Sequence, residues 1–128
     1  MTEKLEFYKC NICENLIQVI LDGAGELVCC GEPMVELKAN VEDASNEKHV
    51  PVVNIESNKV TVTIGSVIHP MEEKHYITCI ILRTTNGERI KRLAPNMEPK
   101  AIFMLDENEK VLEAYEYCNL HGLWKVEL

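Results

Sequence analysis

The sequence predicts a mainly β protein in two parts, a small cysteine-rich unit followed by an antiparallel β-sandwich. Three observations support this prediction. Helical periodicity is hard to find anywhere in the chain. From about residue 40 onward, short runs of β-branched and apolar residues are separated by turn signals. Four of the six cysteines lie before residue 38, where large apolar residues are few.

The second part contains the clearest strand signals. In residues 59–64, K-V-T-V-T-I, valine and isoleucine alternate with threonine, which is typical of a strand with one buried face. The run 75–83 is apolar and β-branched, and the Asn86-Gly87 pair after it indicates a hairpin. Further strands are expected in the ranges 51–56, 89–93, 100–105, 110–117 and 122–128. Short strands at this spacing indicate a sandwich.

The first part is expected to be a separate small unit. It should contain two short hairpins, with turns at Gly23, Gly25 and Gly31. A piece of about 40 residues needs a metal or disulfides to supplement its core. The polar, acidic stretch 38–48 is the expected joint, so we predict domains at 1–37 and 38–128.

Charge and composition exclude several classes of protein. The net charge is −8 and no run of lysine or arginine occurs, which argues against a nucleic-acid partner. The first residues carry no apolar core of signal-peptide length, and no stretch approaches the length of a membrane span. We therefore expect a cytoplasmic protein, in which cysteines stay reduced and are more typical of metal sites than of disulfides.

The first candidate metal site is formed by Cys10-x-x-Cys13 and the adjacent pair Cys29-Cys30. A C-x-x-C turn lets two thiolates face one ion, which is half of a four-sulfur tetrahedral site. Adjacent cysteines must splay to reach the same ion, so we expect a distorted tetrahedron. Soft thiolates suit iron and zinc equally, and spacing alone does not separate them.

The second candidate site draws on the C-terminal part, which contains all four histidines of the chain and Cys118. A single histidine near a strand is more often an ordinary polar group than a ligand, but four together beside a cysteine favour a metal. The histidines are His49, His69, His75 and His121. Cys79 lies on the strand roughly 13 Å from His75 at about 3.3 Å per residue, so we interpret it as a buried apolar residue.

Three motifs in this part resemble a known family. E-K-H-V-P (47–51), H-P-M-E-E-K-H-Y-I (69–77) and C-N-L-H-G-L-W (118–124) resemble the superoxide reductase domain, also called neelaredoxin. The leading C-x-x-C…C-C unit resembles desulforedoxin. The chain thus resembles the two-iron desulfoferrodoxins from end to end, which implies an immunoglobulin-like fold for the sandwich.

The resemblance implies two iron ions and a superoxide reductase activity that converts superoxide to hydrogen peroxide. Four cysteines, Cys10, Cys13, Cys29 and Cys30, would hold the first iron. The second would be held by four imidazoles and an axial thiolate, from His49, His69, His75, His121 and Cys118. Five protein ligands exceed the four of a closed zinc site and leave one octahedral position open.

The resemblance also implies roles for the residues before His49. Lys48 would draw in superoxide and help to supply protons, and Glu47 would close the site after product leaves. Backbone amides from Asn119, Leu120 or later residues are expected to bond to the Cys118 sulfur, and Trp124 is expected to be simple core. The implied partners are a rubredoxin-type electron donor and a second copy of the chain.

Two rival hypotheses remain at this stage. One is a zinc-stapled or electron-carrying β-sandwich without superoxide reductase activity, whose histidine site is vestigial; thiolate sites also take zinc readily as a substitute for iron. The other keeps superoxide as the substrate but makes the protein a dismutase. Metal content and the need for an electron donor distinguish them.

Overall fold

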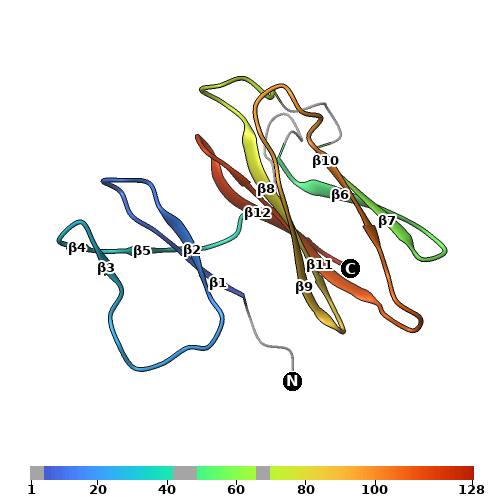
Figure 1. Ribbon diagram of the computed structural model, residues 1–128, viewed down its shortest axis with the longest axis horizontal. Coiled ribbons are helices and arrows are strands. Elements are labelled where there is room, and N and C mark those ends of the chain that lie inside the picture. Colours follow the sequence, from blue (N-terminus) through green and yellow to red (C-terminus); the bar gives the residue numbers. More distant parts are fainter. Residues whose placement is uncertain (1–4, 42–48, 66–69) are drawn as a thin grey trace. The chain divides into compact units, whose positions relative to one another are not determined.

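The chain divides into two compact units, Met1–Lys38 and Ala39–Leu128, in a computed structural model that describes residues 5–41, 49–65 and 70–128. The described residues form strands and turns without a helix, so the mainly β prediction is confirmed (Figure 1). The described part of the chain contains no helix with the length and hydrophobicity that crossing a membrane requires.

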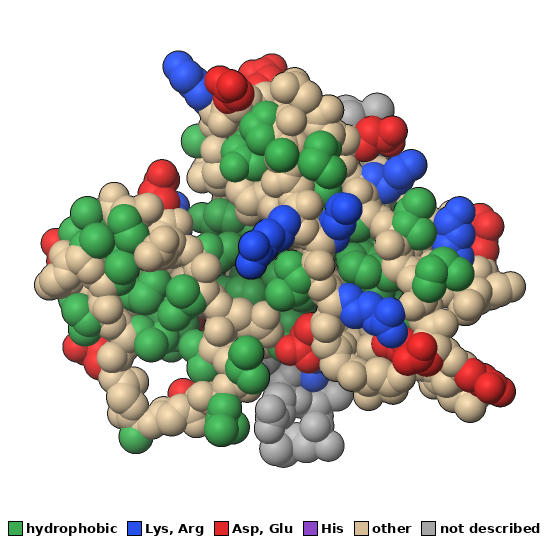
Figure 2. Space-filling model, in the orientation of Figure 1, with side chains coloured by type: hydrophobic (Ala, Val, Ile, Leu, Met, Phe, Trp, Pro, Cys, Tyr) green, Lys and Arg blue, Asp and Glu red, His purple; other side chains and the backbone are tan. Residues whose placement is uncertain are grey.

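The described part of the first unit contains five short strands. They are β1 (Glu6–Lys9), β2 (Leu16–Val19), β3 (Val28–Cys29), β4 (Glu32–Pro33) and β5 (Val35–Leu37). One sheet has the order β2-β1-β5, and β3 and β4 form a separate hairpin. Two hairpins are present as predicted and Gly31 lies in the turn of the second, but the first turns between β1 and β2, and Gly23 and Gly25 lie in the stretch between β2 and β3. The core is thin, since Phe7 and Cys10 are the buried apolar residues of the unit's described part, and Figure 2 shows hydrophobic side chains on its visible surface.

The second unit contains seven strands in two antiparallel sheets. They are β6 (Pro51–Glu56), β7 (Lys59–Ile64), β8 (Ile77–Thr84), β9 (Gly87–Arg92), β10 (Lys100–Met104), β11 (Val111–Cys118) and β12 (Gly122–Glu127). One sheet has the order β10-β7-β6 and the other the order β12-β11-β8-β9. This arrangement confirms the predicted sandwich.

The core of the sandwich lies between these two sheets. Val60, Val62 and Ile64 of β7 have no exposed surface, whereas the threonines between them are partly exposed, as their alternation predicts. From the other sheet, Ile80 and Leu82 of β8 belong to the same buried cluster. Each strand thus contributes alternate residues to one shared interior.

The predicted β8–β9 hairpin is present, but its turn lies one residue earlier than expected. Thr84 pairs with Gly87, so Thr85 and Asn86 form the loop. Gly87 is the first residue of β9, with a φ of 125° that favours glycine. The expected Asn86-Gly87 turn was wrong by one position because the glycine is used at the strand start.

A buried carboxylate joins β8, β9 and the turn before β11. Glu109 accepts hydrogen bonds from the Thr84 hydroxyl and from the Asp106 backbone N–H, the latter at 2.9 Å. Arg89 Nη2 lies 2.6 Å from Glu109 Oε1. These contacts, the Thr84 hydrogen bond first among them, hold the pKa of Glu109 below its usual value.

Candidate metal centres

The first ligand group lies in the N-terminal unit, where four sulfur atoms come within 4.8 Å of one another. They belong to Cys10, Cys13, Cys29 and Cys30. The Sγ atoms of Cys13 and Cys29 lie 3.5 Å apart, and those of Cys29 and Cys30 lie 3.9 Å apart. Sulfurs that surround a metal tetrahedrally at about 2.3 Å lie about 3.8 Å apart. The sulfur group therefore fits a tetrahedral thiolate site.

The first pair of cysteines is positioned by a tight turn after β1. Glu14 N–H donates to the Cys10 carbonyl at 2.9 Å, and Cys13 N–H donates to Cys10 Sγ at 3.4 Å. The N–H groups of Cys13 and Ile12 lower the pKa of Cys10 to about 6. A thiolate is thus favoured at Cys10, which is the form that binds a metal.

The geometry at Cys29 and Cys30 shows how adjacent cysteines can face one ion. Cys29 ends β3 and pairs with Glu32, so Cys30 and Gly31 form a two-residue turn. Both turn residues have positive φ, 54° for Cys30 and 77° for Gly31, as a type I′ turn requires. Because of this turn, the Cys29 and Cys30 side chains do not alternate between opposite faces as they would along a strand. The expected distortion of the tetrahedron stays a prediction.

Hydrogen bonds connect the sulfurs of this group. A hydrogen bond with Cys13, followed by one with Cys10, raises the pKa of Cys29 to about 12. Asn15 Nδ2 also donates to Cys29 Sγ, at 3.8 Å. A bound metal ion would take the place of the thiol protons.

The second ligand group lies in the sandwich. Its nitrogen and sulfur atoms also lie within 4.8 Å of one another and belong to His49, His75, Cys118 and His121. His49 precedes β6, His75 precedes β8, Cys118 ends β11, and His121 lies in the turn before β12. Three segments that are distant in the sequence therefore meet at one point, because Cys118 and His121 lie only three positions apart.

The spacing of these atoms suits a metal. His49 Nε2 lies 2.8 Å from His121 Nδ1, and Cys118 Sγ lies 3.9 Å from the same nitrogen. Neighbouring nitrogens of an octahedral site lie about 3.0 Å apart when each is about 2.1 Å from the metal. The His121 ring stands nearly perpendicular to both other rings, at 86° to His49 and 83° to His75. Imidazole and thiolate ligands together suit iron, among other transition metals.

The sulfur of this group is buried and one of its imidazoles is exposed. Cys118 is 0% exposed and belongs to the core cluster, whereas His121 is an exposed residue. Burial raises the pKa of the Cys118 thiol, and the backbone N–H groups of Leu120 and His121 oppose that rise. The predicted amide donors are thus partly confirmed, but the Asn119 N–H donates to the Tyr76 carbonyl instead, at 3.2 Å.

A β-bulge between β8 and β11 helps to place this site. Tyr117 pairs with Cys79 while Cys118 pairs with Ile77, so Thr78 is an extra residue in β8. The bulge turns Ile77 into the core, beside Cys118, although Cys79 two residues later lies on the opposite face. Cys79 is outside the ligand group, as expected, but it is partly exposed and not fully buried.

Trp124 has a role that the sequence did not predict. Its ring stacks on His49, with centroids 4.8 Å apart and planes at 21°, and Nε1 donates to the His121 carbonyl at 3.0 Å. It therefore supports two of the grouped histidines, and the expectation of simple core was wrong. Its position three residues after His121 was the available signal.

Three predicted site residues, Glu47, Lys48 and His69, lie outside the described residues. Their roles stay predictions. His49, directly after Lys48, is 9% exposed and belongs to the ligand group.

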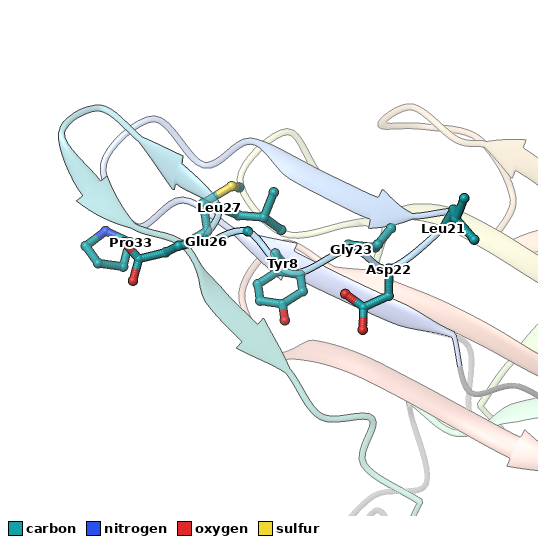
Figure 3. Close-up of a pocket in the computed structure, with 10 residues that line it drawn as sticks. Tyr8, Leu21, Asp22, Gly23, Glu26, Leu27 and Pro33 are labelled. Carbon is teal, nitrogen blue, oxygen red and sulfur yellow. The ribbon is translucent and has the colours of Figure 1, made fainter.

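The N-terminal unit also contains an open pocket of about 320 Å³, shown in Figure 3. Tyr8, Asp22, Glu26, Leu27 and Pro33 are among its lining residues, which include none of the four grouped cysteines. Burial, followed by the carboxylates of Glu36, Glu6 and Asp22, raises the pKa of Tyr8. The pocket is separate from both ligand groups, since its lining contains none of their residues.

Comparisons with known proteins cover both units. Residues 41–127 match the family described as Desulfoferrodoxin, and residues 2–37 match the one described as Desulfoferrodoxin, N-terminal domain. A desulfoferrodoxin of Syntrophotalea carbinolica is 50% identical over 127 residues, which is 99% of each chain. The crystal structure of the superoxide reductase from Treponema pallidum is 33% identical, with a TM-score of 0.85 over 97% of this chain and 98% of that one. The one-iron superoxide reductase of Giardia intestinalis is 40% identical, with a TM-score of 0.56 over 65% of this chain and 100% of that one.

Proposed function

This chain belongs to the desulfoferrodoxin family, and from that premise we propose which of its residues carry the reaction. The chain is a superoxide reductase with two iron ions. One superoxide takes up one electron and two protons and becomes hydrogen peroxide. The observation that carries this conclusion is the convergence of His49, His75, Cys118 and His121 within 4.8 Å.

We assign the first iron to the four cysteines of the N-terminal unit and the second to the histidine group with Cys118. The donor chemistry and the short distances within each group support this assignment. His69 completes the second ligand set by its place in H-P-M-E-E-K-H. We likewise propose that the functional domains are 1–37 and 38–128, which the compactness of the two units supports.

When bound, the second iron supplies the electron for superoxide and one coordination position that is open to a small anion. Neutral imidazoles and a single thiolate offset only one of the two ferrous charges, so the ligand set leaves a local charge of about +1 that attracts superoxide. The exposure of His121 gives the anion access from solvent, while Cys118 stays in the core.

The residues around the ligands hold them in place. The N–H groups of Leu120 and His121 point to the Cys118 sulfur and stabilise its thiolate. Trp124 holds His49 by its ring and the His121 backbone by its N–H. These contacts limit the movement of three ligands, His49 before β6 and the pair Cys118 and His121 at the turn between β11 and β12.

Lys48 and Glu47 act on the substrate and on the closing of the site. The support for this proposal is their position in the sequence directly before His49, a member of the ligand group. Lys48 would attract superoxide and help to supply protons through water. Glu47 would close the site after the product has left.

The remaining partners follow from the chemistry. Each superoxide consumes one electron, so an external donor is required, and we propose a rubredoxin-type protein. We propose a homodimer because the N-terminal unit exposes Ile20 by 90% and Leu21 by 89%. A cytoplasmic location agrees with six cysteines that form no disulfide among the described residues.

The test combines metal analysis with turnover. Iron should be found at both sites after expression with sufficient iron, and ferric thiolate should give visible charge-transfer bands. Superoxide should be consumed only with oxidation of a supplied donor. Zinc at both sites in such a preparation would support the zinc-stapled rival, and dioxygen release without donor oxidation would support a dismutase.

A further inference from the structure

Asn119 follows Cys118 directly and makes three hydrogen bonds to the backbone on both sides of His75. Its Nδ2 donates to the Lys74 carbonyl at 3.0 Å, and its Oδ1 accepts from the Tyr76 N–H at 2.9 Å. Its own backbone N–H donates to the Tyr76 carbonyl at 3.2 Å. One residue of the Cys118 segment thus contacts both neighbours of a histidine from a distant part of the sequence.

The backbone of His75 itself is used within a tight turn. His75 N–H donates to the Glu72 carbonyl at 3.1 Å, and Glu72 N–H donates to the His75 carbonyl at 2.9 Å. The groups that the turn does not use, the Lys74 carbonyl and the Tyr76 N–H, are the two that the Asn119 side chain takes. All backbone polar groups from the Lys74 carbonyl to the Tyr76 carbonyl therefore have partners.

A side-chain amide suits this position for a chemical reason. The Lys74 carbonyl needs a donor and the Tyr76 N–H needs an acceptor, and a primary amide offers both on one short side chain. An ionised aspartate would keep the acceptor but place a second oxygen against the Lys74 carbonyl. Alanine would remove both side-chain contacts and leave only the backbone one.

We propose that Asn119 is a positioning residue for the second iron, because it fixes the His75 turn against the strand end that carries Cys118. This inference rests on the proposed ligand roles of His75 and Cys118. Cys118 is fully buried in the core, so it cannot follow a displaced His75. The separation of the two ligands therefore depends on how firmly the turn at 72–75 is held, and Asn119 holds it.

The test compares Asn119→Ala and Asn119→Asp with a matched control in the iron-loaded full chain. The control is Thr85→Val, since the Thr85 hydroxyl accepts a hydrogen bond from the Lys110 N–H at 3.0 Å at the other end of β8 and β11, away from the grouped ligands. Three quantities are measured: iron loss to a chelator, the position of the visible thiolate band of the second site, and hydrogen exchange of the Tyr76 amide.

Asn119→Ala should weaken iron retention at the second site by about 10- to 100-fold, as loss of a group that orients a ligand usually does. It should also shift the visible band and speed Tyr76 exchange. Asn119→Asp should weaken iron retention but keep Tyr76 protected, because its oxygen still accepts from that amide. Thr85→Val should lower stability only.

Asn119→Asp keeps the size of the side chain. If this variant retains iron and shows the visible band as the parent does, the proposal is overturned, even if Asn119→Ala does not fold. An equal effect of Thr85→Val on the band would also overturn it. None of these readouts needs superoxide. A parent that holds iron at the histidine group but does not reduce superoxide would contradict the proposed function and leave the role of Asn119 standing.

Discussion

The indole ring of Trp124 lies over the imidazole of His49, with ring centroids 4.8 Å apart and an angle of 21° between the planes. The same indole donates its N–H to the His121 carbonyl. One side chain of β12 therefore contacts two histidines from segments far apart in the sequence. These contacts make Trp124 part of the support of the proposed second iron site.

Replacing Trp124 separates its two contacts. Trp124→Phe keeps an aromatic ring over His49 but removes the donor to His121, and should lower the free energy of unfolding by about 1 kcal/mol. Trp124→Leu also removes the stacking and should lose iron faster than Trp124→Phe. Chemical denaturation and iron release to a chelator measure the two effects. Equal iron release by both variants would show that the stacking does not hold His49.

The first centre should be separable from the second. Cys13→Ser should abolish the four-thiolate visible bands and unfold much of the N-terminal unit, whose described core contains only Phe7 and Cys10. Superoxide reduction should continue in the second unit. Visible spectra and iron per chain are the measurements, with Cys79→Ser as the control because Cys79 belongs to neither ligand group. Loss of the second centre's bands in Cys13→Ser would mean that the two units fold as one.

Lys48 should control the capture of superoxide. Lys48→Ala should slow the bimolecular reaction by roughly 10-fold or more at low ionic strength and weaken its dependence on salt, since a fixed cation near an open site raises the encounter rate of an anion. Pulse radiolysis across a range of salt concentrations measures both. Lys91→Ala, an exposed lysine of β9, is the control. A parent-like rate for Lys48→Ala at low salt would exclude this role.

Glu109 should make the sandwich less stable in acid. Its pKa is below the usual 4.5 in the folded chain, chiefly because the Thr84 hydroxyl donates to it. A carboxylate with a lowered folded pKa stabilises the fold fully above its unfolded pKa and loses that contribution as the pH falls through the folded pKa. Glu109→Gln should therefore be less stable than the parent at pH 7, with a difference that shrinks below about pH 4.5. Urea denaturation at several pH values is the measurement, and a difference independent of pH would contradict this explanation.

Local patterns in the sequence predicted much of the sandwich. The alternation in 59–64 identified β7 and its buried face, because side chains on a strand alternate between faces. The Asn86-Gly87 signal identified the β8–β9 hairpin but misplaced its turn by one residue, since Gly87 serves as the first residue of β9. The exact position of the turn depends on which residue needs a positive φ, and the pairing of β8 with β9 decides that.

Other features arise only from contacts between distant segments. The bulge at Thr78 cannot be read from β8 alone, because it exists only relative to β11. Of the amides expected to bond to the Cys118 sulfur, those of Leu120 and His121 do so, whereas Asn119 bonds to the segment around His75. Trp124 was expected to be core, and its stacking on His49 requires β12 and the segment before β6 to meet. Residue types indicated the ligands, whereas their supports depended on tertiary structure.

The most direct test of superoxide reduction is the electron balance of the iron-loaded protein. Superoxide is supplied at a known rate, together with a reduced rubredoxin-type donor, and donor oxidation, hydrogen peroxide and dioxygen are counted. We predict one donor electron consumed and one hydrogen peroxide formed for each superoxide that the protein removes. Removal of superoxide with half as much hydrogen peroxide, matching dioxygen release and no donor oxidation would contradict that prediction and identify a dismutase.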